Sequence, residues 1–279
     1  MTIDLHAVRS LLFLPASNPR AIAKAREASA DLVVLDLEDA VKTGDKEIAR
    51  QAAVDAVAAP WPMPVAIRVN SVASEWHDAD LEAVAHSAAD LVVLPRAITA
   101  DAVRATREWV ERPTLAMIET AAGVLAAAGI AHEAAALIAG TNDLAADLRL
   151  PPDAGREPLQ MALQSIVLSA RAAGIAVFDG VFNGLSDDAG FAAQAAEGRR
   201  LGFDGKSLIH PDQIEPCHRA FAPSEAEIDR ARRLLEAATG GAERFEDQMI
   251  ERMHVDAAQR MLARGVSRHP GEGRDLRSD

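Results

Sequence analysis

The sequence has very little of several residue types, and each scarcity narrows the possible functions. Cys217 is the only cysteine among 279 residues, which excludes an internal disulfide and is typical of a protein in a reducing compartment. No histidine or asparagine pattern accompanies Cys217, so we interpret it as a packing residue rather than a nucleophile. Tyrosine is absent and aromatic residues make up 4% of the chain, too few for the stacking surfaces that bind single-stranded nucleic acid.

Basic residues and long apolar runs are also scarce. The chain has 29 Lys and Arg against 42 Asp and Glu, a formal net charge of −13, which repels phosphate backbones and argues against nucleic-acid partners. No apolar run is long enough to cross a bilayer, and the first ten residues lack a basic region followed by an apolar one. We therefore expect a cytoplasmic protein with no membrane partner.

What the sequence does contain is a repeated alternation of short apolar runs with longer Ala-rich segments of helical spacing. Runs that are apolar nearly throughout are typical of parallel strands covered on both faces. Eight strand and helix units predict an α/β protein with a (β/α)8 TIM barrel over residues 1–221. A doubly wound open sheet is the alternative, but no G-x-G-x-x-G follows the first run. The runs cover residues 10–15, 31–38, 64–70, 90–96, 114–119, 136–140, 175–180 and 205–210.

The alternation of apolar runs and helical segments stops after Phe221. Ser224 is followed three residues later by Glu227, a capping box that predicts a helix over 224–238, and helical spacing returns over 247–265. We expect residues 222–265 to form a C-terminal helical extension that packs across the barrel or reaches a neighbouring subunit. Residues 266–279 are polar and broken by Gly and Pro, which predicts a disordered tail.

Charged and amide residues stand near the ends of the predicted strands. In a parallel barrel the loops at the carboxyl ends converge on one mouth, where the chemistry takes place. Strand side chains alternate, so Asp36 and Glu38 share one face, as do Arg68 and Asn70. For a single position a helix cap is an equal alternative, for example at Thr120 or Asn142. The strand-end residues are Asp36, Glu38, Asp39, Arg68, Asn70, Arg96, Glu119, Asn142, Asp143, Asp179 and His210.

Several acids at one mouth predict a bound cation, because they would otherwise repel one another and raise their own pKa values. The eight histidines include no H-x-x-x-H pair and there is no cysteine cluster, which disfavours zinc. Carboxylates with water suit Mg²⁺, or Mn²⁺ in its place. We predict Glu119 and Asp143 as the metal ligands, with Asp36 and Glu38 behind them holding metal-bound waters.

Several ordered segments, including "RSLLFLPASNPRAIAKA", "DLVVLDLEDAV", "IRVNS", "AMIETAAGV", "GTNDLAADL" and "LGFDGKSLIHPDQI", give the chain a family resemblance over roughly residues 8–262. It resembles the CoA-ester lyases that include citrate lyase beta subunit, malyl-CoA lyase and citramalyl-CoA lyase, within the HpcH/HpaI-type aldolases. The resemblance implies a Mg²⁺-dependent lyase that makes or breaks the carbon-carbon bond between an acyl-CoA and a 2-oxo acid such as oxaloacetate, pyruvate or glyoxylate.

The resemblance also implies roles for particular residues. Glu119 and Asp143 resemble the two metal ligands, and Arg68 resembles the arginine that contacts the substrate and meets its developing negative charge. We expect Asn70 and Asn142 to bind substrate as well.

Arg20 and Lys24 lie four residues apart in a segment whose helix would start at Ser17 or Asn18. Relatives bind coenzyme A near this segment, so we expect both side chains to contact the CoA phosphates, with an ordinary exposed basic face as the alternative.

Two departures from the family pattern affect the site. Arg96 replaces the lysine that relatives carry after strand four. Glu251 replaces an aspartate that resembles a general acid or base reaching a neighbouring subunit's mouth, and its extra methylene shifts the carboxylate.

We expect a homotrimer or a dimer of trimers. The alternatives to a CoA-ester lyase are a CoA-independent aldolase of 2-oxo-4-hydroxy acids and a subunit that binds 2-oxo acids or acyl-CoA but needs partners for turnover.

Overall fold

The computed structural model describes residues 3–239 and 241–266. The chain divides into two compact units, residues 1–221 and residues 222–279. The boundary falls where the strand and helix alternation of the sequence stops.

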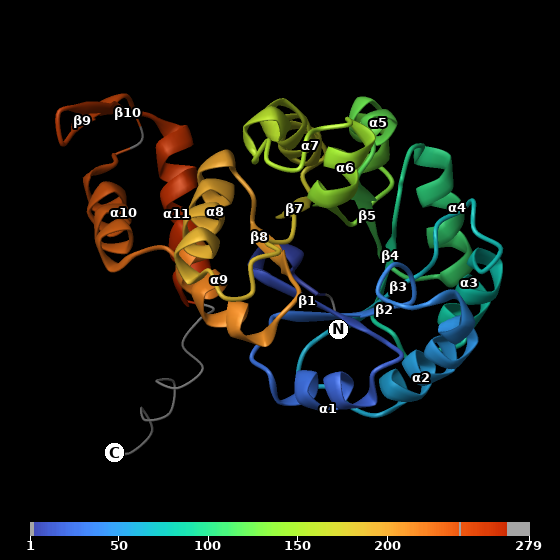
Figure 1. Cartoon of the computed structure of the whole chain (residues 1–279). Helices are drawn as coiled ribbons and strands as arrows, with labels where there is room; N and C mark the ends of the chain where they lie inside the picture. Colours follow the sequence, from blue (N-terminus) through green and yellow to red (C-terminus); the bar gives the residue numbers. More distant parts are fainter. Residues whose placement is uncertain (1–2, 240, 267–279) are drawn as a thin grey trace, which may run out of the picture. The chain divides into compact units, whose positions relative to one another are not determined.

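The first unit is a closed barrel of parallel strands, each hydrogen-bonded to the next in chain order, with β8 pairing back to β1 (Figure 1). This confirms the predicted (β/α)8 barrel and excludes the open sheet. The strands are β1 (Ser10–Pro15), β2 (Leu32–Asp36), β3 (Val65–Arg68), β4 (Leu91–Leu94), β5 (Thr114–Ile118), β6 (Ala136–Ala139), β7 (Ala176–Asp179) and β8 (Gly205–Leu208).

Helices follow the strands, and polar side chains fix where several of them begin. Asn18 accepts a hydrogen bond from the backbone N of Ala21, Thr99 from Ala102 and Thr120 from Gly123, so each satisfies one free donor of a first turn. The helices are α1 (Pro19–Glu27), α2 (Lys46–Ala58), α3 (His77–Ala85), α4 (Ala100–Val110), α5 (Ala121–Ala131), α6 (Thr141–Asp147), α7 (Gln160–Ala173), α8 (Asp188–Leu201) and α9 (Ile214–Phe221).

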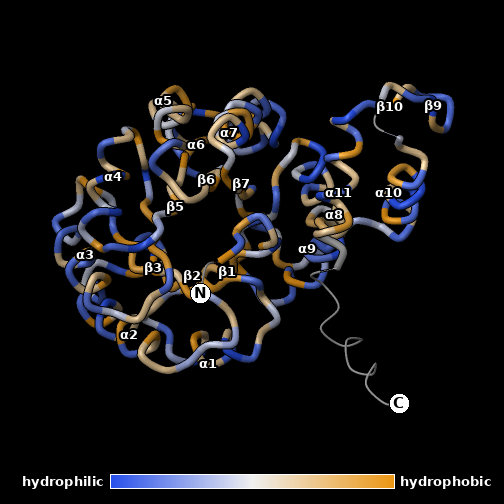
Figure 2. Tube along the Cα trace, turned by 180° about the vertical axis from the view of Figure 1, so that it is seen from behind, coloured by the Kyte–Doolittle hydropathy of each residue, from blue (hydrophilic) through white to orange (hydrophobic). Residues whose placement is uncertain are grey.

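The apolar side chains form two layers, one inside the barrel and one between the barrel and its helices. Figure 2 shows hydrophobic colouring along the barrel strands. Alternation along β5 shows the division: Leu115 and Met117 belong to the inner layer, while Ala116 and Ile118 belong to the outer one. Each strand is therefore buried on both faces, which explains why the runs are apolar nearly throughout.

The same alternation decides which strand-end charges reach the barrel axis. On β7, Phe178 packs in the inner layer, so its neighbour Asp179 points outward. There Asp179 accepts hydrogen bonds from Lys206 Nζ at 3.0 Å and Arg156 Nη2 at 2.6 Å, with no solvent exposure. The expectation that Asp179 joins the acids at the mouth was wrong. His210 also has a local structural role, because its Nδ1 accepts a hydrogen bond from the backbone N of Asp212.

The second unit contains α10 (Glu225–Ala237), the antiparallel strands β9 (Glu243–Phe245) and β10 (Gln248–Ile250), and α11 (Arg252–Val266). The predicted capping box of Ser224 and Glu227 is present. The predicted helix over 247–265 was wrong at its start, because residues 248–250 pair with β9 and the helix begins at Arg252. The unit has its own apolar cluster, which includes Leu234, Ile250 and Ala258.

The tail predicted to be disordered, residues 266–279, lies outside the described residues except for Val266, the last residue of α11. Within the part of the chain that is described, no helix combines the length and the apolar composition needed to span a bilayer.

Candidate active site

A cavity of about 350 Å³ opens at the carboxyl end of the barrel strands. Among the residues predicted from the sequence, Asp36, Arg68, Glu119, Asn142 and Asp143 all line it. They come from β2, β3, β5 and the first turn of α6, so distant parts of the chain meet at one place. The remaining lining residues are Phe13, Leu14, Pro15, Asp39, Ala40, Met117, Ala139, Gly140, Thr141, Val181, Ser207 and Ile209.

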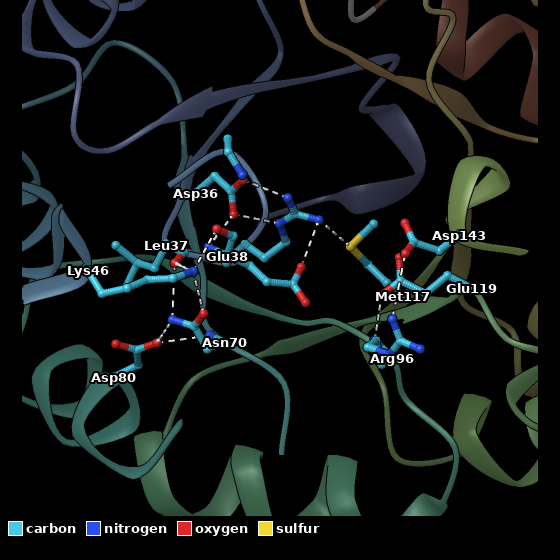
Figure 3. Close-up of polar contacts among 12 residues, drawn as sticks. Asp36, Leu37, Glu38, Lys46, Asn70, Asp80, Arg96, Met117, Glu119 and Asp143 are labelled. Atoms are coloured by element: carbon cyan, nitrogen blue, oxygen red, sulfur yellow. Dashed lines mark hydrogen bonds and ion pairs between the residues drawn. The ribbon is translucent and has the colours of Figure 1, made fainter. Parts of the chain in front are cut away.

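The Arg68 guanidinium is held by two acids from the end of β2. Its Nε and Nη2 donate to the two carboxylate oxygens of Asp36 at 2.7 and 2.6 Å, a bidentate pair. Glu38 Oε2 lies 3.1 Å from Nη1 of Arg68, and that nitrogen also contacts the sulfur of Met117 at 3.7 Å (Figure 3). Asp36 and Glu38 therefore contact the arginine directly, an arrangement that the sequence analysis did not predict.

Burial and charge act on this cluster in opposite directions. Burial lowers the pKa of Arg68, but Asp36 and Glu38 outweigh it and the net pKa shift is upward, so the guanidinium stays charged. Burial raises the pKa of Glu38 to about 8, because Arg68 only partly offsets the desolvation and the nearby acids add to it. The cluster thus presents one permanent positive charge to the cavity.

Glu119 follows β5, and a backbone N–H group holds its carboxylate in place. Its Oε1 accepts from the backbone N of Arg96 at 2.6 Å, and Arg96 adopts a left-handed conformation with φ of 49°. A Cβ on Gly140 would overlap the Cβ and Oε2 of Glu119. Glycine is therefore required at position 140 for the Glu119 carboxylate to occupy this position. Burial, together with repulsion from Asp143 and Asp39, raises the pKa of Glu119 to about 7 despite that hydrogen bond and the charge of Arg68.

Asp143 stands in the first turn of α6 and is more accessible, with 37% of its side chain exposed. Its Oδ1 lies 3.6 Å from Nη1 of Arg96 (Figure 3). The Arg96 side chain is half exposed, so this ion pair is weak and can open. Asp143 and Glu119 both line the cavity, and the charge of Asp143 contributes to the raised pKa of Glu119.

The donor set fits Mg²⁺ better than a metal that takes several protein ligands. Among the residues that the structure describes, no group of three or more His, Cys, Asp and Glu side chains is arranged to hold a metal ion. Glu119 and Asp143 supply two carboxylates at the edge of a cavity, and Mg²⁺ commonly takes one or two carboxylates and completes its shell with water and substrate. Two acids whose mutual repulsion raises a pKa would gain from such a cation.

The two asparagines predicted to bind substrate differ in their placement. Asn142 lines the cavity and exchanges amide hydrogen bonds with Asn183 at 3.2 and 2.9 Å. Asn70 is buried beneath the mouth, where Nδ2 donates to Leu37 O and to Asp80 Oδ2 at 3.0 and 2.6 Å. Its oxygen accepts from Lys46, so both ends of the Asn70 amide are used within the protein.

Lys46 is a contributor that sequence reasoning missed. Its buried Nζ donates to Leu37 O, Glu38 O and Asn70 Oδ1, each at 2.7 Å. These bonds clamp the β2 loop, which carries Asp36 and Glu38, to the end of β3 (Figure 3). Lys46 begins α2 and reads as an ordinary surface lysine in the sequence, so no local pattern identifies this role.

The remaining predicted residues lie on other elements. Arg20 and Lys24 are exposed on α1. Of the two residues predicted to start this helix, Ser17 and Asn18, it is Asn18 that caps its N-terminus. Glu251 belongs to the second unit, directly before α11, and its backbone N donates to His254 Nδ1 at 3.0 Å. Asp39, assigned no role from the sequence, also lines the cavity.

Fold and site together define a barrel enzyme with an acidic, arginine-containing mouth. Residues 9–211 match the model of the family described as HpcH/HpaI aldolase/citrate lyase, and the chain belongs to this family. It is an enzyme of the lyase class that resembles citrate lyase subunit beta.

Relatives align over nearly the whole chain. A (3S)-malyl-CoA thioesterase of Cereibacter sphaeroides is 39% identical, covering 95% of this chain and 96% of that protein. Citrate lyase subunit beta of Escherichia coli is 36% identical, with 92% of each chain covered. The solved structure of the protein CitE from Mycobacterium tuberculosis in complex with magnesium, acetoacetate and coenzyme A is 34% identical, with a TM-score of 0.83 over 94% of this chain and 99% of that one.

Replacing Gly140 with alanine should impair the site without unfolding the barrel. The added Cβ would push Glu119 from its position, and we expect Mg²⁺ affinity to fall at least about ten-fold, as for other changes that displace a ligand. Gly44→Ala is the matched control, because a Cβ there meets nothing within 4 Å. Calorimetric titration of both variants measures the difference, and equal affinities would contradict the assigned packing.

Mg²⁺ affinity should also depend on pH through Glu119. With a pKa of about 7, metal binding must displace a proton below neutrality, so affinity should rise about ten-fold from pH 6 to pH 8. In metal-free protein the raised pKa has the opposite effect: its contribution to stability is lost as the pH rises from about 4.5 to about 7. A Mg²⁺ dissociation constant that stays constant across this range would show that Glu119 is not a ligand.

Proposed function

We propose that the protein is a Mg²⁺-dependent carbon-carbon lyase acting on a malyl-, citramalyl- or citryl-CoA-type ester, with a 2-oxo acid and an acyl-CoA as products. The observation that carries the proposal is the meeting of Arg68, Glu119 and Asp143 at one cavity. The similarity to a (3S)-malyl-CoA thioesterase and to citrate lyase subunit beta supports the choice of substrate class.

The site's residues suit this chemistry. Cleavage of a 3-hydroxyacyl thioester leaves a 2-oxo acid and a thioester enolate, so negative charge develops on two oxygens. Glu119 and Asp143 would hold Mg²⁺, which when bound supplies Lewis acidity toward the oxygens of the 2-oxo acid. Arg68 is charged, buried and fixed by Asp36 and Glu38 before substrate arrives, so it can stabilise developing charge with little reorganisation. Asn142 supplies an amide at the rim, and Asn70 supports the end of β3.

A second candidate function is hydrolysis of the same thioester. It is favoured by the similarity to (3S)-malyl-CoA thioesterases at 39% identity over 95% of the chain. The two reactions start from one substrate and break different bonds: the lyase breaks a carbon-carbon bond, whereas the thioesterase breaks the carbon-sulfur bond with water.

Product analysis separates these functions. Purified protein with Mg²⁺ is incubated with each CoA ester, and 2-oxo acid and free CoA thiol are measured in parallel. A lyase releases 2-oxo acid without free thiol, whereas a thioesterase releases thiol without 2-oxo acid. Turnover of the free hydroxy acids would indicate a CoA-independent aldolase. No turnover by the purified chain alone, with binding retained, would indicate a subunit that needs partners.

Glu119→Ala should lower the rate at least about 100-fold, because the variant loses one of two metal carboxylates. Glu108→Ala is the control, since Glu108 is exposed on α4. If Glu119→Ala retains wild-type activity, the assignment of the site is rejected.

We further propose that Arg20 and Lys24 contact the CoA phosphates. Both are exposed on the helix that follows β1, and β1 lines the cavity through Phe13 and Pro15. Replacing both with glutamate should raise KM for the CoA ester at least about ten-fold at low salt, with a smaller effect at high salt. Arg200→Glu, in the last turn of α8, controls for the loss of positive charge. Equal KM changes in the two proteins would contradict the contact.

Glu251 remains our proposed general acid or base, acting on a neighbouring subunit in a homotrimer or a dimer of trimers. Large exposed apolar side chains on α5 and α7 support subunit contacts, with Leu125 88% and Met161 80% exposed. Light scattering gives the mass of the assembly. Mixing a Glu251→Gln chain with a Glu119→Ala chain should restore activity if the two residues act across subunits, and no restoration would oppose the proposal.

A further inference from the structure

Ser207 has a buried side-chain hydroxyl that has no assigned role in the active site. It lies on β8, 2% exposed, and lines the cavity together with Ile209 of the same segment. Its Oγ makes no hydrogen bond to any residue within the described ranges. Ser10 shows what a structural serine does in this barrel: equally buried on the adjacent strand β1, it bonds His218 Nε2 at 2.8 Å and accepts from the backbone N of Asp31 at 2.9 Å.

A buried hydroxyl without a hydrogen-bond partner destabilises the fold relative to one that has a partner. Ser207 faces the barrel axis, because its neighbours Lys206 and Leu208 point outward toward the ion pair with Asp179 and toward the outer apolar layer. Its side chain is therefore directed toward the barrel interior, where Ser207 lines the cavity, and its Oγ has no hydrogen-bond partner among the described residues. A polar atom of a bound molecule can satisfy it there.

The position of Ser207 indicates which part of the substrate it meets. Strand β8 pairs with β1, with Ser207 in register with Leu11, and β1 leads into α1, which carries Arg20 and Lys24. The metal carboxylates belong to β5 and to the start of α6, on other strands of the barrel. If CoA binds at Arg20 and Lys24 as proposed, the acyl-CoA half of the substrate would lie along the β8 and β1 wall, with the 2-oxo acid half toward Glu119 and Asp143.

The wall around Ser207 suits a thioester. Val181 and Ile209, the cavity-lining residues that follow β7 and β8, are apolar, so a carboxylate held there by one neutral hydroxyl would be poorly solvated. A thioester carbonyl is neutral in the bound substrate and gains negative charge only during the reaction. A hydroxyl donor is matched to that change, because its hydrogen bond strengthens as charge develops.

We infer that the Ser207 hydroxyl donates a hydrogen bond to the thioester carbonyl oxygen of the acyl-CoA. The inference rests on the proposed function and holds for both of its candidate reactions, since the same oxygen becomes the enolate oxygen in carbon-carbon cleavage and the tetrahedral oxyanion in hydrolysis. Ser207 keeps its proton and forms no bond to carbon. It has no base beside it among the described residues, so it is a donor and not a nucleophile.

The direct test is a binding comparison that needs no turnover. Calorimetry measures the dissociation constants of acetyl-CoA and of S-ethyl-CoA, a thioether that lacks only the carbonyl oxygen. Wild-type protein should bind acetyl-CoA about three- to ten-fold more tightly, the range expected of one hydrogen bond. Ser207→Ala should bind the two ligands equally, by weakening acetyl-CoA and leaving S-ethyl-CoA unchanged.

Kinetics and stability give a second reading. Ser207→Ala should lower kcat for the CoA ester by roughly 100-fold, as for the loss of one donor to a developing oxyanion, while its melting temperature stays equal or rises because an unpaired hydroxyl is removed. Ser10→Ala is the matched control: it should lower the melting temperature through lost hydrogen bonds and leave the ratio of the two dissociation constants at its wild-type value.

Two results would overturn the inference. One is a Ser207→Ala protein that keeps the preference for acetyl-CoA. The other is a Ser207→Ala protein that loses binding of the 2-oxo acid alone, measured with pyruvate or oxaloacetate and Mg²⁺, which would place the hydroxyl on the other half of the substrate. Failure of the proposed function looks different: wild-type protein itself would bind neither CoA ligand, or would turn over no CoA ester.

Discussion

The buried ion pair between Asp36 and Arg68 is the interaction on which the rest of the site depends. A guanidinium this deep in the barrel is stable only because both carboxylate oxygens of Asp36 accept its hydrogen bonds, at 2.7 and 2.6 Å. Asp36 in turn accepts from the backbone N of Glu38 and of Ala40, and Lys46 ties this loop to Asn70. The contacts between the end of β2 and the end of β3 therefore hold the positive charge of Arg68 in place.

On the side of the cavity that carries Glu119 and Asp143, the negative charges are only partly compensated. The charge of Asp143 helps to raise the pKa of Glu119, and Asp143 itself pairs with Arg96, a half-exposed partner at 3.6 Å. Space for Glu119 is secured by Gly140, where a side chain would overlap it. A fixed positive charge thus faces an acid pair that is short of positive charge, and this division suits a substrate that bridges a metal ion and an arginine.

The sequence predicts the strands well because a strand buried on both faces must be apolar nearly throughout. It predicts Glu119 and Asp143 because polar residues interrupt this pattern at several successive strand ends, although a helix cap explains any single one equally well. Side-chain direction was the weak point: Asp179 ends a strand as Glu119 does, but it points outward to Lys206 and Arg156. Asn70 and Lys46 act through bonds between loops, and the unpaired hydroxyl of Ser207 is visible only once its surroundings are known.

Anomalous scattering from crystals soaked in Mn²⁺, which replaces Mg²⁺ at oxygen-rich sites, tests the central claim most directly. The account predicts one strong peak in the barrel mouth, within about 2.0–2.3 Å of a carboxylate oxygen of Glu119 and of Asp143, with Arg68 still paired to Asp36. A peak that contacts neither acid, or separate peaks at each, would contradict it.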